Sequence, residues 1–515
     1  MKIQIRTAQK IFLLLIIILA GLLRFYQIDT IPPGLYQDEA AIGYNAYTIL
    51  TKGVDEYGTK YPLLFRSFGD YKLPGYIYTT AISMAIFGKT EFAIRFPSAL
   101  MGTITVFIFY LFINELLNID TSNLFHKKRR AFALFGSFLL AISPWHIQFS
   151  RGGFEATEAF FFFVLAGFLT LFYWRKKNIL ALFSGVFFFA LTMYTYHPYR
   201  IIAPIIVSLI FFTFAFVKKL PKNHLAVGFI FLVLLSIPYV KFSLTKQGTA
   251  RLAQTSFVNE HPTHTLLEAA SLYPLIYLKN YISFFSLSFL FSEGDGIGRH
   301  QMAHFGLLPY WQLFLLFIGL VGVFYLKRSL FKYTVIVLGL LAPIAASLVV
   351  PSPHTLRSEL MIIPLILIIT YGLFSLLKST LPFKKVFLCL VLIAALYESS
   401  YYLHFYYVHY PKINALDWGG NYKEVVQEAE EYKKNYSYIV VDNYFSFAAI
   451  YFKFYSDDIR PVFADSTWKK PKSWGSKKAL YIRPYYGDGE KDAKIIKTIY
   501  LNTPNKDVFA RFWEI

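Results

Sequence analysis

Long apolar runs separated by short polar stretches make up most of the first 402 residues. A helix that crosses a bilayer needs about 20 mostly apolar residues, and the runs in this part of the chain approach or reach that length. The pattern therefore predicts eleven membrane-spanning helices. They cover residues 11–29, 93–117, 131–147, 155–174, 179–196, 199–217, 225–240, 311–326, 333–350, 356–377 and 385–402.

The first apolar run begins like a signal peptide, because Lys2, Arg6 and Lys10 precede its core. No small-residue cleavage motif follows that core. We therefore expect residues 11–29 to stay in the chain as an uncleaved anchor.

Basic residues gather in short stretches between the predicted spans, and the positive-inside rule places such clusters in the cytoplasm. The clusters are Lys2/Arg6/Lys10, Lys127–Arg130, Arg175–Lys177, Lys218/Lys219/Lys222, Lys327/Arg328/Lys332 and Lys378/Lys384/Lys385. With eleven spans, every basic cluster falls on the cytoplasmic side if the N-terminus is cytoplasmic and the C-terminus is outside. This arrangement also requires that residues 74–88 do not cross the membrane. We expect 74–88 to form a helix in the outer interface. The alternative is a shallow re-entrant pair over 74–117.

This topology places three connecting stretches outside the cytoplasm. They are residues 30–92, 148–154 and 241–310, and the last contains a predicted interfacial helix over 264–291. Residues 1–402 thus form a transmembrane domain of the mainly α class, and its first outer loop is 30–92.

Residues 403–515 change character. Strand-like runs of β-branched and aromatic residues, YSYIVVDNY and KALYIRPYY, alternate with the polar helical run YKEVVQEAEEYKKN. This pattern predicts a small α/β domain outside the membrane. No catalytic signature is present in it, so we expect a domain that docks or orients an acceptor.

The composition agrees with a membrane protein. Only 16% of residues are charged and 56% are hydrophobic, whereas soluble domains contain about 25% charged residues. The net charge of +20 does not indicate a nucleic-acid partner, because the basic residues lie between the apolar runs. The single cysteine, Cys389, excludes a disulfide scaffold or a cysteine-based metal site.

Asp38 and Glu39, in GLYQDEAAIGYNAY, form an acid pair directly after the first span. Paired carboxylates at a membrane face are costly unless they are partnered or used. Adjacent residues point in different directions, so one carboxylate can take a proton while the other orients it or holds a cation. The alternative is a helix cap, because acids favour the first turn of a helix. The two interpretations stay open at this point.

Cationic and acidic side chains also stand in the other predicted outer stretches. Arginine and lysine both bind phosphate, arginine through a planar fork and lysine as a point charge. Each residue alone also fits a plain role as an interface anchor or helix-terminal charge. The candidates are Asp70 and Lys72 in FGDYKLPGYIY, Arg151 and Glu155 in SRGGFEATEAF, His197 and Arg200 in YTYHPYRI, and His354 and Arg357 in PSPHTLRSEL.

The order of these motifs resembles the polytopic glycosyltransferases of the C-type fold, specifically family 39 and its bacterial relatives. These include the protein O-mannosyltransferases and the lipid A aminoarabinose transferases. The matching stretches lie within residues 1–375. They are GLYQDEAAIGYNAY, GDYKLPGYIY followed by FGKTEFAIRFPSALMG, SPWHIQFSR, YTYHPYRI and HTLRSELMIIP.

Such enzymes move a sugar from a polyprenyl-phosphate donor to an acceptor outside the cytoplasm. The resemblance implies the following roles: Asp38 as catalytic base, Glu39 as its partner, Lys72 as a donor-phosphate ligand, Arg200 and Arg357 as further phosphate ligands, and Glu155 as a second acid. Relatives differ in their use of a divalent metal, so no cofactor is assigned. The departing lipid phosphate builds negative charge that fixed cations stabilise, and one-base displacement inverts the anomeric centre.

Two other functions fit parts of the pattern. A transporter or flippase of lipid-linked sugars is the first, although its charges should lie within the spans. A polymerase or ligase that uses the same geometry on another acceptor is the second. The sequence names neither the sugar nor the acceptor.

Overall fold

The computed structural model describes residues 2–120, 122, 125–216, 220–442, 447–464, 473, 478–483, 494–500 and 508–514. The chain forms two compact units. The first contains Met1–Tyr26, Pro62–Thr79 and Arg95–Tyr402, and the second contains Gln27–Tyr61, Thr80–Ile94 and Leu403–Ile515. The stretch that carries the acid pair therefore belongs to the same unit as the C-terminal residues.

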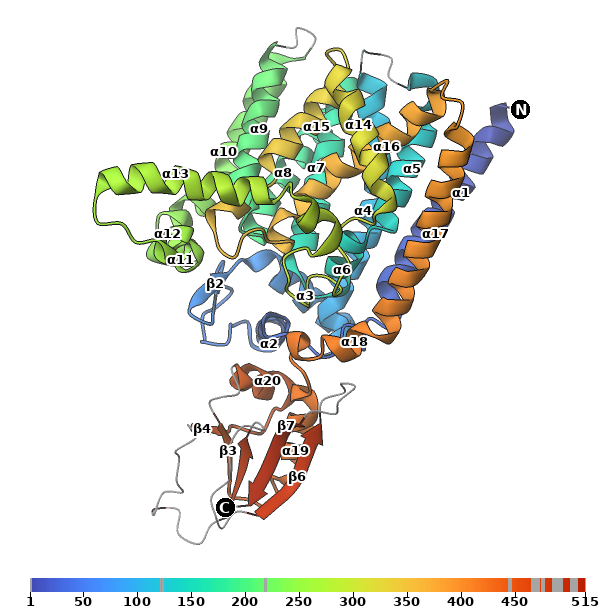
Figure 1. The fold of residues 1–515 in the computed structure, drawn as a ribbon. Coiled ribbons are helices and arrows are strands. Elements are labelled where there is room, and N and C mark those ends of the chain that lie inside the picture. Colours follow the sequence, from blue (N-terminus) through green and yellow to red (C-terminus); the bar gives the residue numbers. More distant parts are fainter. Residues whose placement is uncertain are drawn as a thin grey trace. The chain divides into compact units, whose positions relative to one another are not determined.

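The first unit is a helical bundle (Figure 1). Its longer helices are α1 (Lys2–Phe25), α4 (Glu91–Ile119), α5 (Arg129–Ala141), α7 (Glu155–Lys176), α8 (Ile179–Thr195), α9 (Tyr199–Phe216), α10 (Lys222–Ser243), α13 (Leu266–Ser283), α14 (Trp311–Tyr325), α15 (Leu330–Leu341), α16 (Ile362–Lys378) and α17 (Lys384–Val408). Its shorter elements are β1 (Phe65–Ser67), β2 (Asp70–Lys72), η1 (His126–Lys128), α6 (Pro144–Arg151), α11 (Lys246–Thr255), α12 (Phe257–Glu260), η2 (Ser288–Ser292), η3 (Ala346–Leu348) and η4 (Leu356–Met361). Helix α3 (Pro74–Phe87) begins in this unit and continues into the second, as α17 also does, and the first residues of α4 belong to the second unit.

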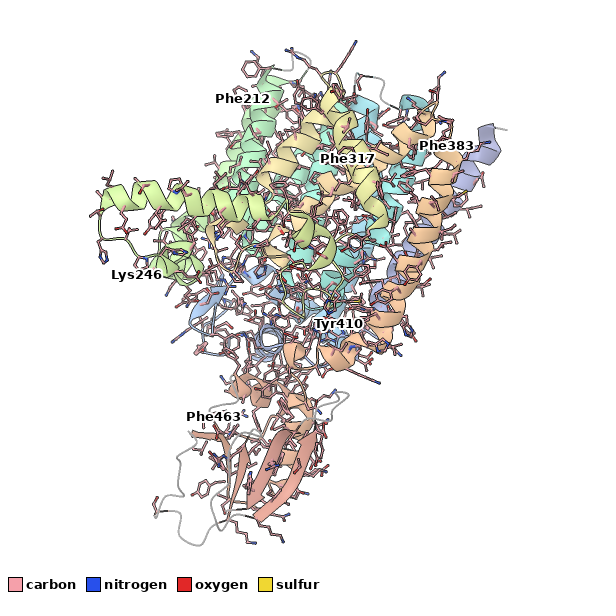
Figure 2. All side chains as sticks on the ribbon, in the orientation of Figure 1. Phe212, Lys246, Phe317, Phe383, Tyr410 and Phe463 are labelled. Carbon is pink, nitrogen blue, oxygen red and sulfur yellow. The ribbon has the colours of Figure 1, made fainter. Side chains whose placement is uncertain are left out.

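Large apolar side chains cover the outside of the bundle. Phe212, Phe317 and Phe383 lie on its surface in Figure 2, and they are 65%, 67% and 77% exposed. Such a surface is unfavourable in water and suits lipid hydrocarbon. The mainly helical, multi-pass membrane architecture predicted from the sequence is confirmed.

In the described part of the chain, eight helical stretches are long and apolar enough to cross a membrane, or nine if α5 and α6 form one bent span. The eight are Thr7–Phe25, Glu91–Ile119, Glu155–Lys176, Tyr199–Phe216, Lys222–Ser243, Leu330–Leu348, Leu356–Lys378 and Lys384–Val408. Helices α8 and α14 are apolar but shorter.

The prediction of one continuous helix over residues 131–147 is wrong. Helix α5 ends at Ala141, α6 begins at Pro144, and the two are bent by 54°. Proline has no N–H to donate and disfavours a helical conformation at the preceding residue. That residue, Ser143, caps α6 by accepting the N–H of His146 through its hydroxyl at 3.4 Å. The sequence Ser143–Pro144 is therefore a signal for the start of a new helix.

The helix ends next to the basic clusters lie at one end of the first unit. Figure 1 shows the N-terminal end of α1, the C-terminal ends of α4, α9, α14 and α16 and the starts of α5, α10, α15 and α17 at the top of the view, opposite β2 and α11. Lys218 and Lys219 lie outside the described residues. The alternation read from the sequence thus corresponds to a real division between two ends of this unit.

Helix α13 runs across the direction of α9 and α10 (Figure 1). None of its residues is buried, and Leu266 and Leu267 are 91% and 82% exposed. The hydroxyl of Tyr281 donates to the carbonyl of Leu340 at 2.8 Å, which fastens the helix to α15. A transverse helix with exposed leucines fits the interface of a bilayer.

The second unit is built on a five-stranded mixed sheet. Its order is β4-β3-β5-β7-β6, with β3 parallel to β4 and β5, and β7 antiparallel to both of its neighbours. Its elements are α2 (Gln37–Lys52), α18 (Tyr410–Ile413), η5 (Leu416–Trp418), α19 (Tyr422–Tyr432), β3 (Tyr438–Asp442), α20 (Ala448–Tyr455), β4 (Val462–Ala464), β5 (Ala479–Arg483), β6 (Lys494–Tyr500) and β7 (Val508–Glu514). The predicted small C-terminal domain of mixed α and β structure is confirmed.

Candidate functional site

The acid pair lies in the first turn of α2, which begins at Gln37. Glu39 is buried, and its Oε2 accepts the backbone N–H of Tyr36 at 3.2 Å, so this carboxylate caps the helix. Asp38 is half-buried and takes no part in that bond. The structure therefore gives the capping role to Glu39.

The loop before α2 is held by residues near the C-terminal sheet. The hydroxyl of Tyr451 donates to the carbonyl of Leu35 at 3.0 Å, and the rings of Tyr36 and Trp418 meet edge to face at 5.7 Å. Gly419 has φ of 82°, and a Cβ at this residue would lie 2.2 Å from the carbonyl oxygen of Leu35. Glycine is therefore required where the chain passes the loop of the acid pair.

Lys72 and Asp70 lie on the hairpin of β1 and β2 in the first unit. Both side chains are largely buried. Oδ2 of Asp70 accepts a hydrogen bond from Nη1 of Arg251 on α11 at 2.8 Å, and this is also an ion pair. Gln254, on the same helix, donates to the carbonyl of Gly69 at 2.6 Å. Helix α11 thus fixes the strand that carries Lys72.

His197 and Arg200 follow the end of α8 and lie beside this hairpin. Nε2 of His197 donates to the carbonyl of Tyr71 at 3.2 Å, and Nδ1 of His197 accepts from Arg200 at 3.3 Å. Burial lowers the pKa of His197 to about 3, and the positive charges of Arg200, Arg251 and Lys72 act in the same direction. His197 is therefore a neutral imidazole among cations.

Arg200 is engaged within the chain. Its guanidinium donates to the hydroxyl of Ser243 at 2.7 Å and to the carbonyl of Gly248 at 3.0 Å, and it lies 4.9 Å from the ring centre of Phe242. These contacts join the start of α9 to the turn between α10 and α11. Arg200 therefore fixes the position of α11, the helix that carries Arg251.

Arg357 and His354 lie on the loop that leads into α16. Nη1 of Arg357 donates to the carbonyl of Val350 at 3.0 Å. Burial lowers the pKa of His354 well below its usual value, and the charges of Arg357, Arg299 and Arg251 contribute. Since the charge of Arg251 acts on both His197 and His354, the hairpin of Lys72 and the loop of Arg357 border one cationic region.

Glu155, at the start of α7, lies near this region. The charges of Glu155, Arg251 and Arg357 all act on Tyr196, which precedes His197. The structure thus brings together seven of the ten candidates: Asp70, Lys72, Glu155, His197, Arg200, His354 and Arg357.

Arg151, another candidate, has a structural position. Its guanidinium donates to the carbonyls of Leu23 at 2.9 Å and Tyr26 at 2.7 Å and thereby caps the end of α1. In the same corner, Arg24 contacts Nδ1 of His146 at 2.6 Å. Both arginines satisfy backbone carbonyls, in the way that cations commonly do at helix C-termini.

Sequence reasoning missed several polar residues of the first unit. Arg251 lies in a polar stretch whose partners are far away in the chain, and nothing local marks it. Glu158 accepts the hydroxyl of Thr79 at 2.6 Å. Glu359 is buried, and neither of its carboxylate oxygens has a hydrogen-bond partner among the described residues. Its position two residues after Arg357 is the only signal in the sequence.

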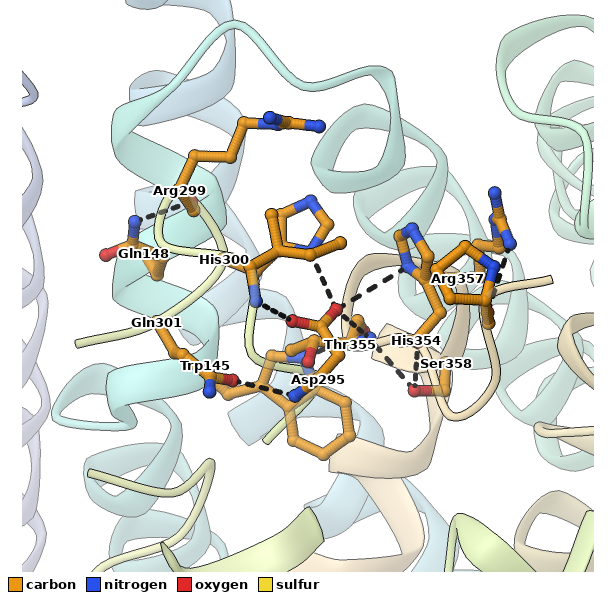
Figure 3. A network of polar contacts seen from close by, with 12 residues as sticks. Trp145, Gln148, Asp295, Arg299, His300, Gln301, His354, Thr355, Arg357 and Ser358 are labelled. Carbon is orange, nitrogen blue, oxygen red and sulfur yellow. Dashed lines mark hydrogen bonds and ion pairs between the residues drawn. The ribbon is translucent and has the colours of Figure 1, made fainter. Parts of the chain in front are cut away.

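Asp295, His300 and His354 form a further cluster that the sequence did not single out as a group (Figure 3). Oδ2 of Asp295 accepts from Nδ1 of His300 at 2.7 Å and from the backbone N–H of Thr355 at 2.8 Å. Burial alone would raise the pKa of Asp295, but the hydrogen bonds from His300, Thr355 and Ile297 outweigh it and lower the pKa. Among the described residues this is the group of acids and histidines that could hold a metal ion.

An apolar cavity of about 560 Å³ opens among α4, α7, α8, α9, α15 and α16. Its walls include Phe163, Trp174, Ile206 and Ile363. Six residues of α9, roughly 9 Å at 1.5 Å per residue, separate Ile206 from Arg200. Helix α9 therefore links the cationic region to the cavity.

A known protein family matches the part of the chain that contains several of these residues. Residues 72–240 match the model of the family described as dolichyl-phosphate-mannose-protein mannosyltransferase. This match begins at Lys72 and ends within α10. No curated protein sequence matches the chain.

Solved structures share the fold. ArnT from Cupriavidus metallidurans bound to undecaprenyl phosphate superposes with a TM-score of 0.61 at 10% identity over 97% of each chain. The oligosaccharyltransferase of Archaeoglobus fulgidus in the apo form gives a TM-score of 0.50 at 14% identity over 87% of this chain. The same enzyme, AglB, in complex with an inhibitory peptide and a dolichol-phosphate gives 0.51 at 13% identity.

The chain spans about 64% of the length of the archaeal oligosaccharyltransferase, whereas it covers ArnT almost completely. At these identities the likeness is one of fold, and the family model adds the sequence signature. The chain thus shares the fold of these membrane glycosyltransferases, and its residues 72–240 match the mannosyltransferase family model.

Proposed function

We propose that this chain transfers a sugar from a polyprenyl-phosphate donor to an acceptor at the outer face of the membrane, with inversion at the anomeric carbon. The observation that carries the proposal is the cationic region together with the apolar cavity, whose wall at Ile206 lies roughly 9 Å along α9 from Arg200. Lys72, Arg251 and Arg357 suit a phosphate, and the cavity suits a hydrocarbon chain. Together they match the two halves of a lipid phosphate.

Two related structures support this choice of donor. ArnT of Cupriavidus metallidurans was solved with undecaprenyl phosphate, and AglB of Archaeoglobus fulgidus with a dolichol-phosphate. Both ligands are polyprenyl phosphates. When the sugar leaves such a donor, negative charge grows on the phosphate, and fixed cations in a site of low dielectric constant stabilise it.

Asp38 serves as the general base in this proposal. The acceptor hydroxyl or amine attacks the anomeric carbon, the bond to the phosphate oxygen breaks, and Asp38 takes the proton of the acceptor. Glu39 is the partner that fixes the turn, because it caps α2. Glu155 is the second acid, and no metal ion is assigned to this step.

The same proposal includes eleven spans. The eight long helices, the bent pair of α5 and α6, and the two shorter helices α8 and α14 correspond one to one with the eleven apolar runs. With the basic clusters in the cytoplasm, the N-terminus is cytoplasmic, and Asp38, Lys72 and the C-terminal domain lie outside. Residues 403–515 then form an extracytoplasmic domain that orients the acceptor.

The test uses the full chain in liposomes that contain a radiolabelled polyprenyl-phosphate sugar and an extract of candidate acceptors. We expect label to pass into an acceptor fraction and free polyprenyl phosphate to accumulate. Movement of intact donor between leaflets without cleavage of the sugar–phosphate bond would instead show a flippase. That outcome would overturn the proposal.

A further inference from the structure

We propose that Asp295, His300 and His354 bind a divalent transition-metal ion of the Zn²⁺ type. Their three ligand atoms lie within 4.8 Å of one another. Oδ2 of Asp295 lies 2.7 Å from Nδ1 of His300 and 3.9 Å from Nδ1 of His354. Two ligands of a tetrahedral zinc ion, each about 2.0–2.1 Å from the metal, lie roughly 3.3 Å apart. The present separations are of that order, so binding would require these side chains to adjust around the ion.

The cluster is buried and braced. The side chains of Asp295, His300 and His354 are only 0%, 3% and 9% exposed. Oδ1 of Asp295 accepts the N–H of Ile297 at 3.0 Å, and the N–H of Asp295 donates to Gln301 at 3.1 Å. Outer partners of this kind orient metal ligands and raise affinity. Figure 3 shows the three side chains converging from the loop after η2 and the loop before η4.

A hydrogen-bond network without an ion explains only part of this arrangement. The bond from His300 to Asp295 satisfies that pair. His354 stands 3.9 Å from the same carboxylate, which is beyond hydrogen-bond range. Its Nδ1 instead accepts the backbone N–H of Arg357 at 3.4 Å. A second buried imidazole thus faces the carboxylate without being bonded to it, and a metal ion shared by the two would replace the long contact between Nδ1 of His354 and the N–H of Arg357.

The surroundings select the kind of ion. The positive charges of Arg299 and Arg357 act on His354. They repel a cation, so an ion that bound only through electrostatic attraction would be disfavoured here. Figure 3 shows the guanidinium of Arg299 directed away from Asp295. Imidazole nitrogens suit Zn²⁺ and its neighbours in the first transition row, whereas Mg²⁺ and Ca²⁺ prefer oxygen ligands. The cluster should therefore discriminate against Mg²⁺ and Ca²⁺.

The ion would join two loops that are distant in sequence, residues 293–301 and 351–355. It takes no part in the transfer step proposed above, so the two proposals stand or fall separately. Three protein ligands leave a fourth position of a tetrahedral ion for water.

The experiment uses the full chain, purified in detergent and treated with a chelator. After incubation with Zn²⁺ and removal of the excess, the metal content per chain is measured by mass spectrometry. We expect one retained Zn²⁺ per chain, and no retained Mg²⁺ or Ca²⁺ under the same treatment. A Zn²⁺-dependent rise in the unfolding temperature should accompany binding.

His354→Gln and Asp295→Asn should each weaken Zn²⁺ binding at least about 100-fold, because outer-shell partners alone contribute 10- to 100-fold. His304→Asn is the matched control. His304 is exposed on the same loop with φ of 59°, a conformation that asparagine tolerates, and its replacement should leave binding unchanged.

Equal zinc retention by wild type and His354→Gln overturns the proposal and leaves a hydrogen-bond network only. If neither variant folds, Co²⁺ added to the wild-type chain decides the matter. An absorption spectrum typical of four- or five-coordinate Co²⁺ supports the site, and a spectrum of hexaaqua Co²⁺ overturns it.

Discussion

Nη1 of Arg251 lies 2.8 Å from Oδ2 of Asp70, although 181 residues separate the two in the sequence. The side chain of Asp70 is buried, whereas that of Arg251 is 38% exposed. The pair fastens α11 to the strand that ends at Lys72. It therefore couples the long loop after α10 to the proposed phosphate site.

Arg251→Ala should destabilise the first unit by about 1–3 kcal/mol, because a buried carboxylate then loses its donor. The measurement is thermal unfolding in detergent. Lys246→Ala, an exposed change on the same helix, is the control. In a double-mutant cycle with Asp70→Asn the two losses should not add. Strict additivity would show that the ion pair contributes nothing.

Lys72→Ala should raise the KM for the lipid-phosphate donor more than it lowers kcat, since it removes a cation that contacts the phosphate before the reaction. Lys72→Arg should restore only part of the affinity, because the planar guanidinium differs from an ammonium group. Lys60→Ala, an exposed lysine of the same stretch 30–92, serves for comparison. Unchanged donor affinity in Lys72→Ala would return Lys72 to the role of an interface anchor.

Asp38→Asn should lower turnover by about 10²- to 10⁴-fold, the usual contribution of a general base. Asparagine caps a helix about as well as aspartate does, and the cap of α2 comes from Glu39 in any case. The fold and donor binding should therefore persist. The measurement is single-turnover transfer in liposomes. Wild-type turnover in a folded Asp38→Asn variant would falsify the assignment.

Glu39→Gln tests whether Glu39 caps α2 while Asp38 acts as the base. The amide oxygen can still accept the N–H of Tyr36, so α2 should keep its start and the unfolding temperature should change little. We expect a smaller loss of turnover than in Asp38→Asn, because Glu39 acts on the turn rather than on the acceptor proton. A larger loss than that of Asp38→Asn would exchange the two roles.

Stability should fall as the pH drops below about 6.5, the ordinary pKa of histidine. His197 has a pKa of about 3 in the folded chain, so between these values the unfolded chain binds a proton that the folded chain does not. The free energy of unfolding then decreases by about 1.4 kcal/mol for each pH unit lost. His197→Asn should flatten this slope in denaturation curves between pH 4 and about 6.5. An unchanged slope would mean that His197 is protonated in the fold.

The apolar runs and their basic flanks predicted the helical bundle because burial in lipid leaves a strong, local pattern. The break at Ser143–Pro144 was equally local, since a serine followed by proline is a helix-start signal. The run of 131–147 is apolar on both sides of the break, so hydropathy alone predicts one span there. The C-terminal domain was also predictable from its alternating strands.

The partners of the polar residues were not predictable. Asp70 alone reads as a loop acid, and only the fold brings Arg251 to it. Asp295 and His300 stand in an ordinary polar turn, and His354 meets them through folding over more than fifty residues. Similarly, Glu39 could be assigned as the cap only from the position of the N–H of Tyr36. Local patterns define elements, whereas long-range contacts define the site.

The cavity between α9 and α15 has a consequence for how the proposed enzyme would meet its donor. Its walls are apolar, and the nearest helices carry exposed phenylalanines such as Phe212. A donor that enters through such a surface never leaves the leaflet, so its search is two-dimensional. Rates would then depend on the mole fraction of donor among the lipids and not on its bulk concentration. Diluting the liposomes with plain lipid should slow transfer, whereas diluting the whole suspension with buffer should not.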